Sequence, residues 1–124
     1  MPDPISARHG VRVFVCPADG PRLAGERDAL DVIGEAYGQD ADLIAVPVQR
    51  LDEAFFTLST RVAGEIMQKF VNYRVRLAFV GDIGRHLEAS SALRDLVRET
   101  NRGRQVWFVA DLEELDARLA RETP

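Results

Sequence analysis

Asp82 is the residue in this sequence whose type and position best suit ligand chemistry. It follows the apolar segment at 75–80 and Gly81, and open parallel sheets bind ligands just beyond the carboxyl ends of their strands. A carboxylate placed there could orient a ligand or act as a general base, with Glu65 or Asp111 as a second acidic group. The same side chain could instead accept hydrogen bonds from the loop backbone after Gly81.

A second group of polar side chains repeats at helical spacing. Arg61, Glu65 and Lys69 lie four residues apart, and Asn72 and Tyr73 continue the run. Opposite charges at this spacing support a helix by ~0.3–0.5 kcal/mol per pair. A long polar and aromatic run at a helix end also suits contact with another protein chain. Lys69 would act as a nucleophile only if it were buried.

Hydroxyl groups gather just before this helix. Thr57, Ser59 and Thr60 can cap its first turn. A helix start also favours an anion or a phosphorylated side chain, so the same segment could serve as a switch. Ser90 or Ser91 can cap a later helix in the same way.

The sequence lacks the patterns of established catalytic and metal sites. His9, His86 and the single cysteine, Cys16, do not have metal-ligand spacing, and Cys16 is expected to be a small core residue. Asp28 and Asp31 lie near a helix start, where carboxylates complement the helix dipole. There is no phosphate loop and no Gly-x-Ser-x-Gly elbow. We therefore predict no catalytic residue, no metal and no cofactor.

Composition narrows the class of protein. The chain has 124 residues and a formal net charge of −4, from 16 basic and 20 acidic residues. This balance gives no bulk attraction to nucleic acid or to anionic lipid, and no stretch is apolar enough to span a membrane. A single cysteine is typical of a reducing compartment, so we expect a cytoplasmic protein. Lys69 is the only lysine among many arginines, which indicates a GC-rich bacterial genome.

Strand-like and helix-like segments alternate along most of the chain. Residues 1–10 are expected to form a disordered tail and residues 11–121 a single domain. The order predicts parallel strands joined by right-handed crossovers, hence an α/β fold with helices on a sheet of four or five strands. The expected strands are 11–16, 22–24 (as a hairpin with the first), 43–48, 75–80 and 106–110, and the expected helices are 26–37, 60–73, one between Ser90 and Gly103, and one after Asp111.

Spacing also predicts which side chains these helices bury. Leu30, Ile33 and Tyr37 form the expected stripe of the first helix, and Gly34 beside it would allow close packing. Gly103 is expected to end a helix in the left-handed conformation.

Four segments together resemble the bacterial family of domain of unknown function 4180. They are ERDALD at 26–31, AGEIMQKFVNYR at 63–74, VGD at 80–82 and RETNRG at 98–103, of which the second is the most specific. The resemblance covers about residues 11–119. It implies no activity, because the family has no established one.

The order of elements also resembles the STAS domains of anti-sigma-factor antagonists. Those domains run from a hairpin through alternating helices and strands, and they often carry a phosphorylated Ser or Thr where a loop enters the second helix. Thr57, Ser59 and Thr60 occupy that region here, although the Asp-Ser or Asp-Thr pair of those domains is absent.

These observations lead to two expectations about function. The first is a non-enzymatic regulatory or protein-interaction module, acting on a protein partner or as a homodimer. Its working surface would be the connector at 52–60 and the helix at 60–73. The alternative is a small ligand-binding protein or enzyme with a site at the carboxyl ends of the strands around Asp82.

Overall fold

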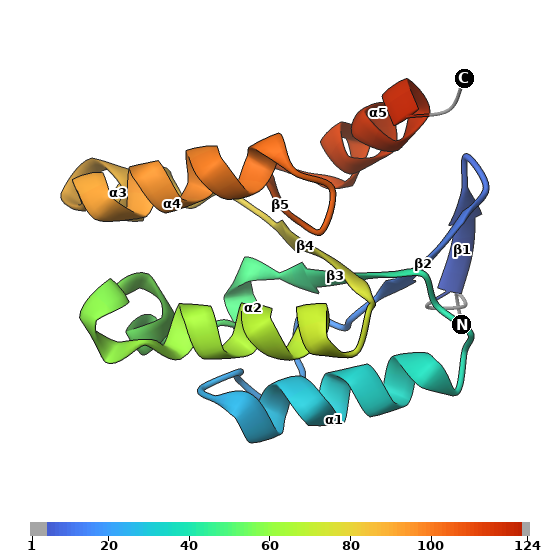
Figure 1. Ribbon diagram of the computed structural model, residues 1–124, viewed down its shortest axis with the longest axis horizontal. Helices are drawn as coiled ribbons and strands as arrows, with labels where there is room; N and C mark the ends of the chain where they lie inside the picture. Colours follow the sequence, from blue (N-terminus) through green and yellow to red (C-terminus); the bar gives the residue numbers. More distant parts are fainter. Residues whose placement is uncertain (1–4, 123–124) are drawn as a thin grey trace.

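Five strands form one sheet in the computed structural model, which describes residues 5–122 (Figure 1). Their order across the sheet follows the chain: β1 (Ile5–Arg8), β2 (Val11–Val15), β3 (Leu43–Pro47), β4 (Arg76–Val80) and β5 (Val106–Val109). β1 pairs antiparallel with β2, and the remaining neighbours are parallel. The α/β class and the mostly parallel sheet predicted from the sequence are confirmed.

Helices connect the parallel strands. They are α1 (Glu26–Tyr37), α2 (Val62–Asn72), α3 (Gly84–Ala89), α4 (Ser91–Arg102) and α5 (Leu112–Glu122), with three 3-10 helices η1 (Val48–Arg50), η2 (Glu53–Phe56) and η3 (Leu58–Thr60). Right-handed crossovers between strands in sequential order place their helices on one face of the sheet. The core agrees, because buried residues of α1 and α2 and half-buried residues of α4 share one apolar cluster.

A row of aromatic side chains ties the connector after β3 to this face. The register sets Phe79 between Val46 and Phe108 on neighbouring strands. Phe55 of η2 is fully buried and meets the Phe79 ring edge-on, with 5.0 Å between centroids. Burial of such a ring contributes on the order of 2–3 kcal/mol. The segment before α2 is therefore fixed to the sheet through Phe55.

The opposite face of the sheet is covered mainly by α5. Its Leu115 and Leu119 pack against Val13, Ala45 and other strand residues in a second apolar cluster. In Figure 1, α5 (red) lies close to the β1–β2 hairpin (blue), and the two are in contact. Because both faces are covered, β3 reads as a nearly continuous apolar run, as predicted.

Polar and aromatic contacts at one edge hold α5 in place. The guanidinium groups of Arg76 and Arg118 lie over the Trp107 ring, 4.6 and 4.4 Å from its centroid. Glu122 accepts two hydrogen bonds from Arg76, at 3.1 and 2.8 Å, and one from Arg104 at 2.9 Å. Burial alone would raise the pKa of Glu122, but the hydrogen bonds from Arg104 and Arg76 outweigh it and lower the pKa.

The start of the chain corrects two expectations. Residues 5–8 form strand β1, where a disordered tail over residues 1–10 was predicted; residues 1–4 lie outside the described residues. The hairpin partner of β2 is β1, and the predicted strand at 22–24 is wrong. Leu23 makes only an isolated parallel bridge with Leu51, because the loop before it wraps around the Arg50 side chain.

The buried face of α1 also differs from the predicted stripe. Ile33 is buried, but Leu30 is 37% exposed and Tyr37 is 57% exposed. The helix instead approaches the sheet through small residues, including Ala29 and Ala36, which are nearly inaccessible. A side chain at Gly34 would meet no atom within 4 Å, so this glycine does not serve close packing.

Several helix ends follow from local chemistry. Ser90 accepts a hydrogen bond from the Leu93 amide, which confirms the predicted cap. Asp111 accepts one from the Glu114 amide and caps α5 in the same way. Gly103 is extended rather than left-handed, with φ −87°. α2 begins at Val62, because Arg61 before it is left-handed with φ +66°.

No helix within residues 5–122 combines the length and the apolar character that crossing a membrane requires.

We expect Glu122→Gln to lower the free energy of unfolding by about 1–2 kcal/mol at neutral pH, because it weakens charge-assisted hydrogen bonds to two arginines. The pKa of Glu122 is lowered on folding, so its stabilising contribution exists above the unfolded value of about 4.3 and disappears as pH falls through the folded pKa. Urea unfolding over a series of pH values from neutral down through the acid range measures both effects. The exposed Glu113→Gln is the matched control, and a deficit of Glu122→Gln that stays constant over the whole series would contradict this account.

Candidate functional site

The connector before α2 is ordered by its own hydroxyl and carboxyl groups. Asp52 accepts a hydrogen bond from the Ala54 amide and caps η2. The Thr60 hydroxyl donates to the carbonyls of Ala54 and Thr57, at 2.6 and 2.8 Å, and accepts from the Val62 amide. Thr60 therefore stabilises the turn that leads into α2.

The polar residues predicted on α2 reach the surface. Glu65, Asn72 and Tyr73 are exposed, whereas Lys69 is half-buried. Lys69 does not pair with Glu65 on its own helix; its ammonium lies 3.8 Å from the Glu26 carboxylate of α1. The long lysine side chain thus bridges the two helices instead of supporting one.

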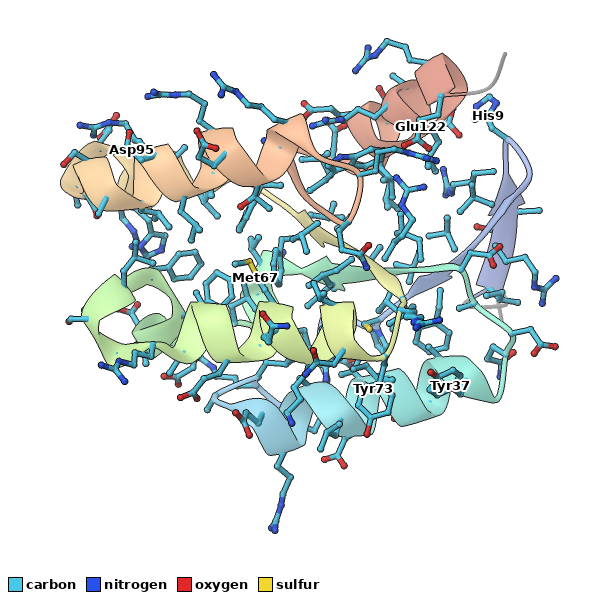
Figure 2. All side chains as sticks on the ribbon, in the orientation of Figure 1. His9, Tyr37, Met67, Tyr73, Asp95 and Glu122 are labelled. Atoms are coloured by element: carbon cyan, nitrogen blue, oxygen red, sulfur yellow. The ribbon has the colours of Figure 1, made fainter. Side chains whose placement is uncertain are left out.

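Two tyrosines close the other end of the contact between α1 and α2. The Tyr37 hydroxyl donates to the Tyr73 carbonyl at 3.0 Å, and the rings meet edge-to-face at 6.3 Å. Figure 2 shows both side chains at the C-terminal ends of these helices. Tyr73 is 44% exposed, so the pair presents aromatic surface to solvent.

A groove lies over the outer side of α2. Its cavity has a volume of about 520 Å³. Leu58, Met67 and Leu96 supply its apolar part, and Figure 2 shows Met67 between α2 and α4. We call this cavity the α2 groove; its lining residues are Glu26, Leu58, Arg61, Gly64, Glu65, Met67, Gln68 and Leu96. Of the polar face predicted from the sequence on this helix, Arg61 and Glu65 line the groove, whereas Lys69, Asn72 and Tyr73 do not.

The predicted hydroxyl residues face a neighbouring cavity. Thr57 and Ser59 are exposed and line a cavity of about 430 Å³, together with Ser90 and the ring of His86. Thr57 and Ser59 are separated by only one residue and belong to the turn that Thr60 holds in place. The structure therefore brings Thr57, Ser59 and a helix-capping serine to one hollow, whereas Thr60, the third predicted hydroxyl, does not line it.

Asp82 lies at the carboxyl ends of the strands, as predicted. Gly81 before it has φ +143°, and a side chain there would come within 2.4 Å of Val48. Only glycine fits both constraints. Asp82 is exposed and accepts a hydrogen bond from the Gly84 amide at 2.8 Å, which is the loop role that the sequence left open.

The rim around Asp82 differs in composition from the expectation. A cavity of about 240 Å³ there, the rim cavity, is lined by Arg22, Val48, Gln49, Leu51, Glu53, Phe56, Asp82, Ile83, Arg85 and His86. Neither Glu65 nor Asp111 lines it: Glu65 borders the α2 groove, and Asp111 caps α5. The predicted carboxylate pairings with Asp82 are not formed.

An aromatic stack separates the rim cavity from the hydroxyl-lined one. The rings of Phe56 and His86 are nearly parallel, with 3.8 Å between centroids and 5° between planes. Both residues line both cavities. The sequence did not reveal this pair, because its members are thirty positions apart and only folding brings them together.

Cys16 and the possible metal ligands were the remaining candidates for chemistry. Cys16 is 2% exposed at the end of β2, and burial raises the pKa of its thiol to about 12, with the positive charge of Arg50 opposing the rise. No group of three or more acidic, cysteine or histidine side chains among residues 5–122 could hold a metal ion. Cys16 is thus a core residue.

Comparison with known protein families finds a match over most of the chain. The model of a family described as Domain of unknown function (DUF4180) matches residues 8–119, nearly the whole chain. No curated protein and no solved structure matches.

We expect the Cys16 thiol to be inert toward 5,5′-dithiobis(2-nitrobenzoate) in the folded protein at about pH 8, because it is buried and protonated there. In urea it should react fully, with one thiol per chain. Absorbance of the released thiolate measures both rates. Reaction of the folded protein at the rate of a small free thiol would contradict the burial.

Proposed function

The chain belongs to the DUF4180 family, which brings no activity with it, and we propose that it is a non-enzymatic regulatory module that binds a protein partner through the α2 groove. The partner is expected to place an apolar side chain on Leu58, Met67 and Leu96 and to engage the flanking charges of Arg61 and Glu65. A protein that acts by contact in this way needs no cofactor.

Gly64 is the observation that carries this proposal. It lies within α2, and a side chain there would meet no atom within 4 Å. Glycine inside a helix costs about 0.5–1 kcal/mol relative to alanine. No contact among the described residues requires a glycine at this position. The absence of a side chain leaves the backbone of α2 open to the groove. A partner that approaches this backbone closely would account for the glycine.

Exposed apolar side chains lie on the pair of helices α1 and α2, outside the lining of the groove. Within the described part of the chain, the large hydrophobic residues that are exposed are Leu30, Tyr37, Val71 and Tyr73. All four belong to α1, α2 or the residue that ends α2. Tyrosines with this mixture of apolar ring and polar hydroxyl are typical of protein interfaces.

The regulatory part of the proposal draws on the connector. Thr57 and Ser59 are exposed and lie beside the α2 groove. A phosphate on either residue would add negative charge next to the charged residues of the groove. The STAS-like order of elements supports a regulatory role by analogy of fold alone. The cytoplasmic location stays a prediction from cysteine content.

We expect Gly64→Arg to abolish partner binding while leaving the fold at least as stable, since the added side chain enters the groove and a helix glycine is removed. Gly34→Arg on α1 is the matched control, because Gly34 is also helical and open but does not line the groove. Parallel affinity capture from the native host with quantitative mass spectrometry, and urea unfolding of each variant, provide the measurements.

The expected result is a protein recovered equally by the wild type and Gly34→Arg and lost with Gly64→Arg. Equal recovery with both variants, or no specific protein with the wild type, would contradict the proposal. Unfolding curves separate lost contact from lost structure.

The rim cavity favours a second candidate, a site for a small anionic ligand. Arg22 and Arg85 line this cavity, and neither forms an ion pair with any of residues 5–122. Unpaired guanidinium groups at the carboxyl ends of parallel strands suit phosphate or carboxylate. Asp82 and Glu53 beside them would select a ligand that also carries hydrogen-bond donors.

We expect inorganic phosphate to shift the amide resonances of the rim cavity, and Arg22→Gln or Arg85→Gln to weaken this binding roughly tenfold. Arg27→Gln is the charge-matched control, because Arg27 is exposed on α1 and does not line the cavity. Equal weakening by all three variants would indicate only long-range attraction and would remove this candidate.

A further inference from the structure

Arg50 is the one charged side chain that is buried within residues 5–122, with 7% exposure. Its Nε donates to the Pro21 carbonyl at 2.6 Å, and its Nη1 donates to the Pro17 carbonyl at 3.0 Å. The guanidinium lies against Gly20, where a side chain would come within 2.6 Å of it. Arg50 thus holds the loop between β2 and α1, and this structural task uses only two of its three nitrogens.

The third nitrogen, Nη2, has no hydrogen-bond partner among the described residues, and Arg50 lines a cavity of about 370 Å³. No carboxylate among residues 5–122 lies within 4.0 Å of the guanidinium. Nη2 is accessible to solvent, because the one fully buried side-chain nitrogen or oxygen without a partner among residues 5–122 is Nε of Arg8. A ligand in the cavity can therefore reach the guanidinium.

Three carboxylates of α1 line the same cavity. Asp28, Asp31 and Glu35 are spaced by three and four residues, which places them on one side of the helix. Asp28 accepts a hydrogen bond from the Ala24 amide at 2.8 Å, whereas Asp31 and Glu35 have no partner among the described residues. Two carboxylates of this wall are therefore free to bind.

The position of Glu35 gives independent support for a ligand. It lies in the last turn of α1, where a negative charge opposes the helix dipole, and no basic residue occupies that turn. Such placement costs about 0.3–1 kcal/mol. Among residues 5–122 this carboxylate accepts no hydrogen bond and forms no ion pair, so a cationic group in the cavity would explain its position.

We propose that this cavity, the Arg50 cavity, binds a dibasic amino acid such as lysine. Three carboxylates against one guanidinium leave its lining with a net charge of −2, which complements a ligand with two cationic groups and one carboxylate. The ligand carboxylate accepts from Nη2 of Arg50, and its ammonium groups bind Asp31 and Glu35. The volume lies within the range of small-molecule sites. No residue lines both this cavity and the α2 groove or the rim cavity, so the proposal is independent of those above.

The test is a titration of the full chain with three related probes. Binding is measured by calorimetry and by the shift of the Arg50 Nε–H resonance. L-lysine carries every group that the cavity calls for, L-norleucine lacks the side-chain ammonium, and cadaverine lacks the carboxylate. We expect lysine to bind at least tenfold more tightly than either analogue and to shift the Arg50 resonance. Absence of lysine binding up to about 10 mM, or equal binding of lysine and cadaverine, would overturn the proposal.

Variants then test the wall of the cavity. Asp31→Asn and Glu35→Gln should each weaken lysine binding roughly tenfold, since each removes one charge-assisted contact. Both residues are exposed and make no contact that the fold needs, so the variants are expected to fold, as circular dichroism would verify. Glu88→Gln, exposed on α3, is the charge-matched control and should bind lysine as the wild type does. Unchanged affinity in Asp31→Asn and Glu35→Gln would also overturn the proposal.

Discussion

Burial of both faces of the parallel strands is the constraint on which the rest of this structure depends. Parallel strands leave no face to water, because their crossover helices need apolar surface to pack on. The helices α1, α2 and α4 cover one face of the sheet. The other side depends on the attachment of α5, the helix that follows β5. The contacts of Trp107 with two arginines, and of Glu122 with Arg76 and Arg104, provide that attachment.

The same constraint places the candidate functional sites at the periphery of the domain. With both faces of the sheet closed, the open surfaces are the outer sides of the helices and the carboxyl rim of the strands. The α2 groove lies on the first, and the rim cavity lies on the second. The Arg50 cavity lies between α1 and the end of β3. A buried guanidinium organises this corner, because the carbonyl groups of Pro17 and Pro21 in the loop before α1 accept hydrogen bonds from two of its nitrogens.

The elements of this fold were largely predictable, but the faces they bury were less so. Helix α1 was predicted at its observed bounds, yet its buried side was misassigned. Spacing alone cannot predict that Ala29 and Ala36 are more buried than Leu30 and Tyr37, because hydrophobicity favours burial of the larger residues. The distance between helix and sheet decides, and a close approach selects small side chains. Tyr37 instead binds the Tyr73 carbonyl at the surface.

Local sequence determined the strands of the parallel part, the helices α1, α2, α4 and α5, the caps at Ser90 and Asp111, and the place of Asp82 after a buried strand, since these follow from contacts a few residues apart. Helix α3 was not predicted. The pairing of β1 with β2 is also local, because a two-residue turn at His9 and Gly10, both with positive φ, joins the strands. Tertiary structure alone decided the stack of Phe56 on His86 and the burial of Arg50 opposite the carboxylates of α1. Each joins segments whose meeting depends on how the whole sheet twists and closes. A single sequence carries no signal for such distant pairs, because the energy that selects them arises only when the core is packed.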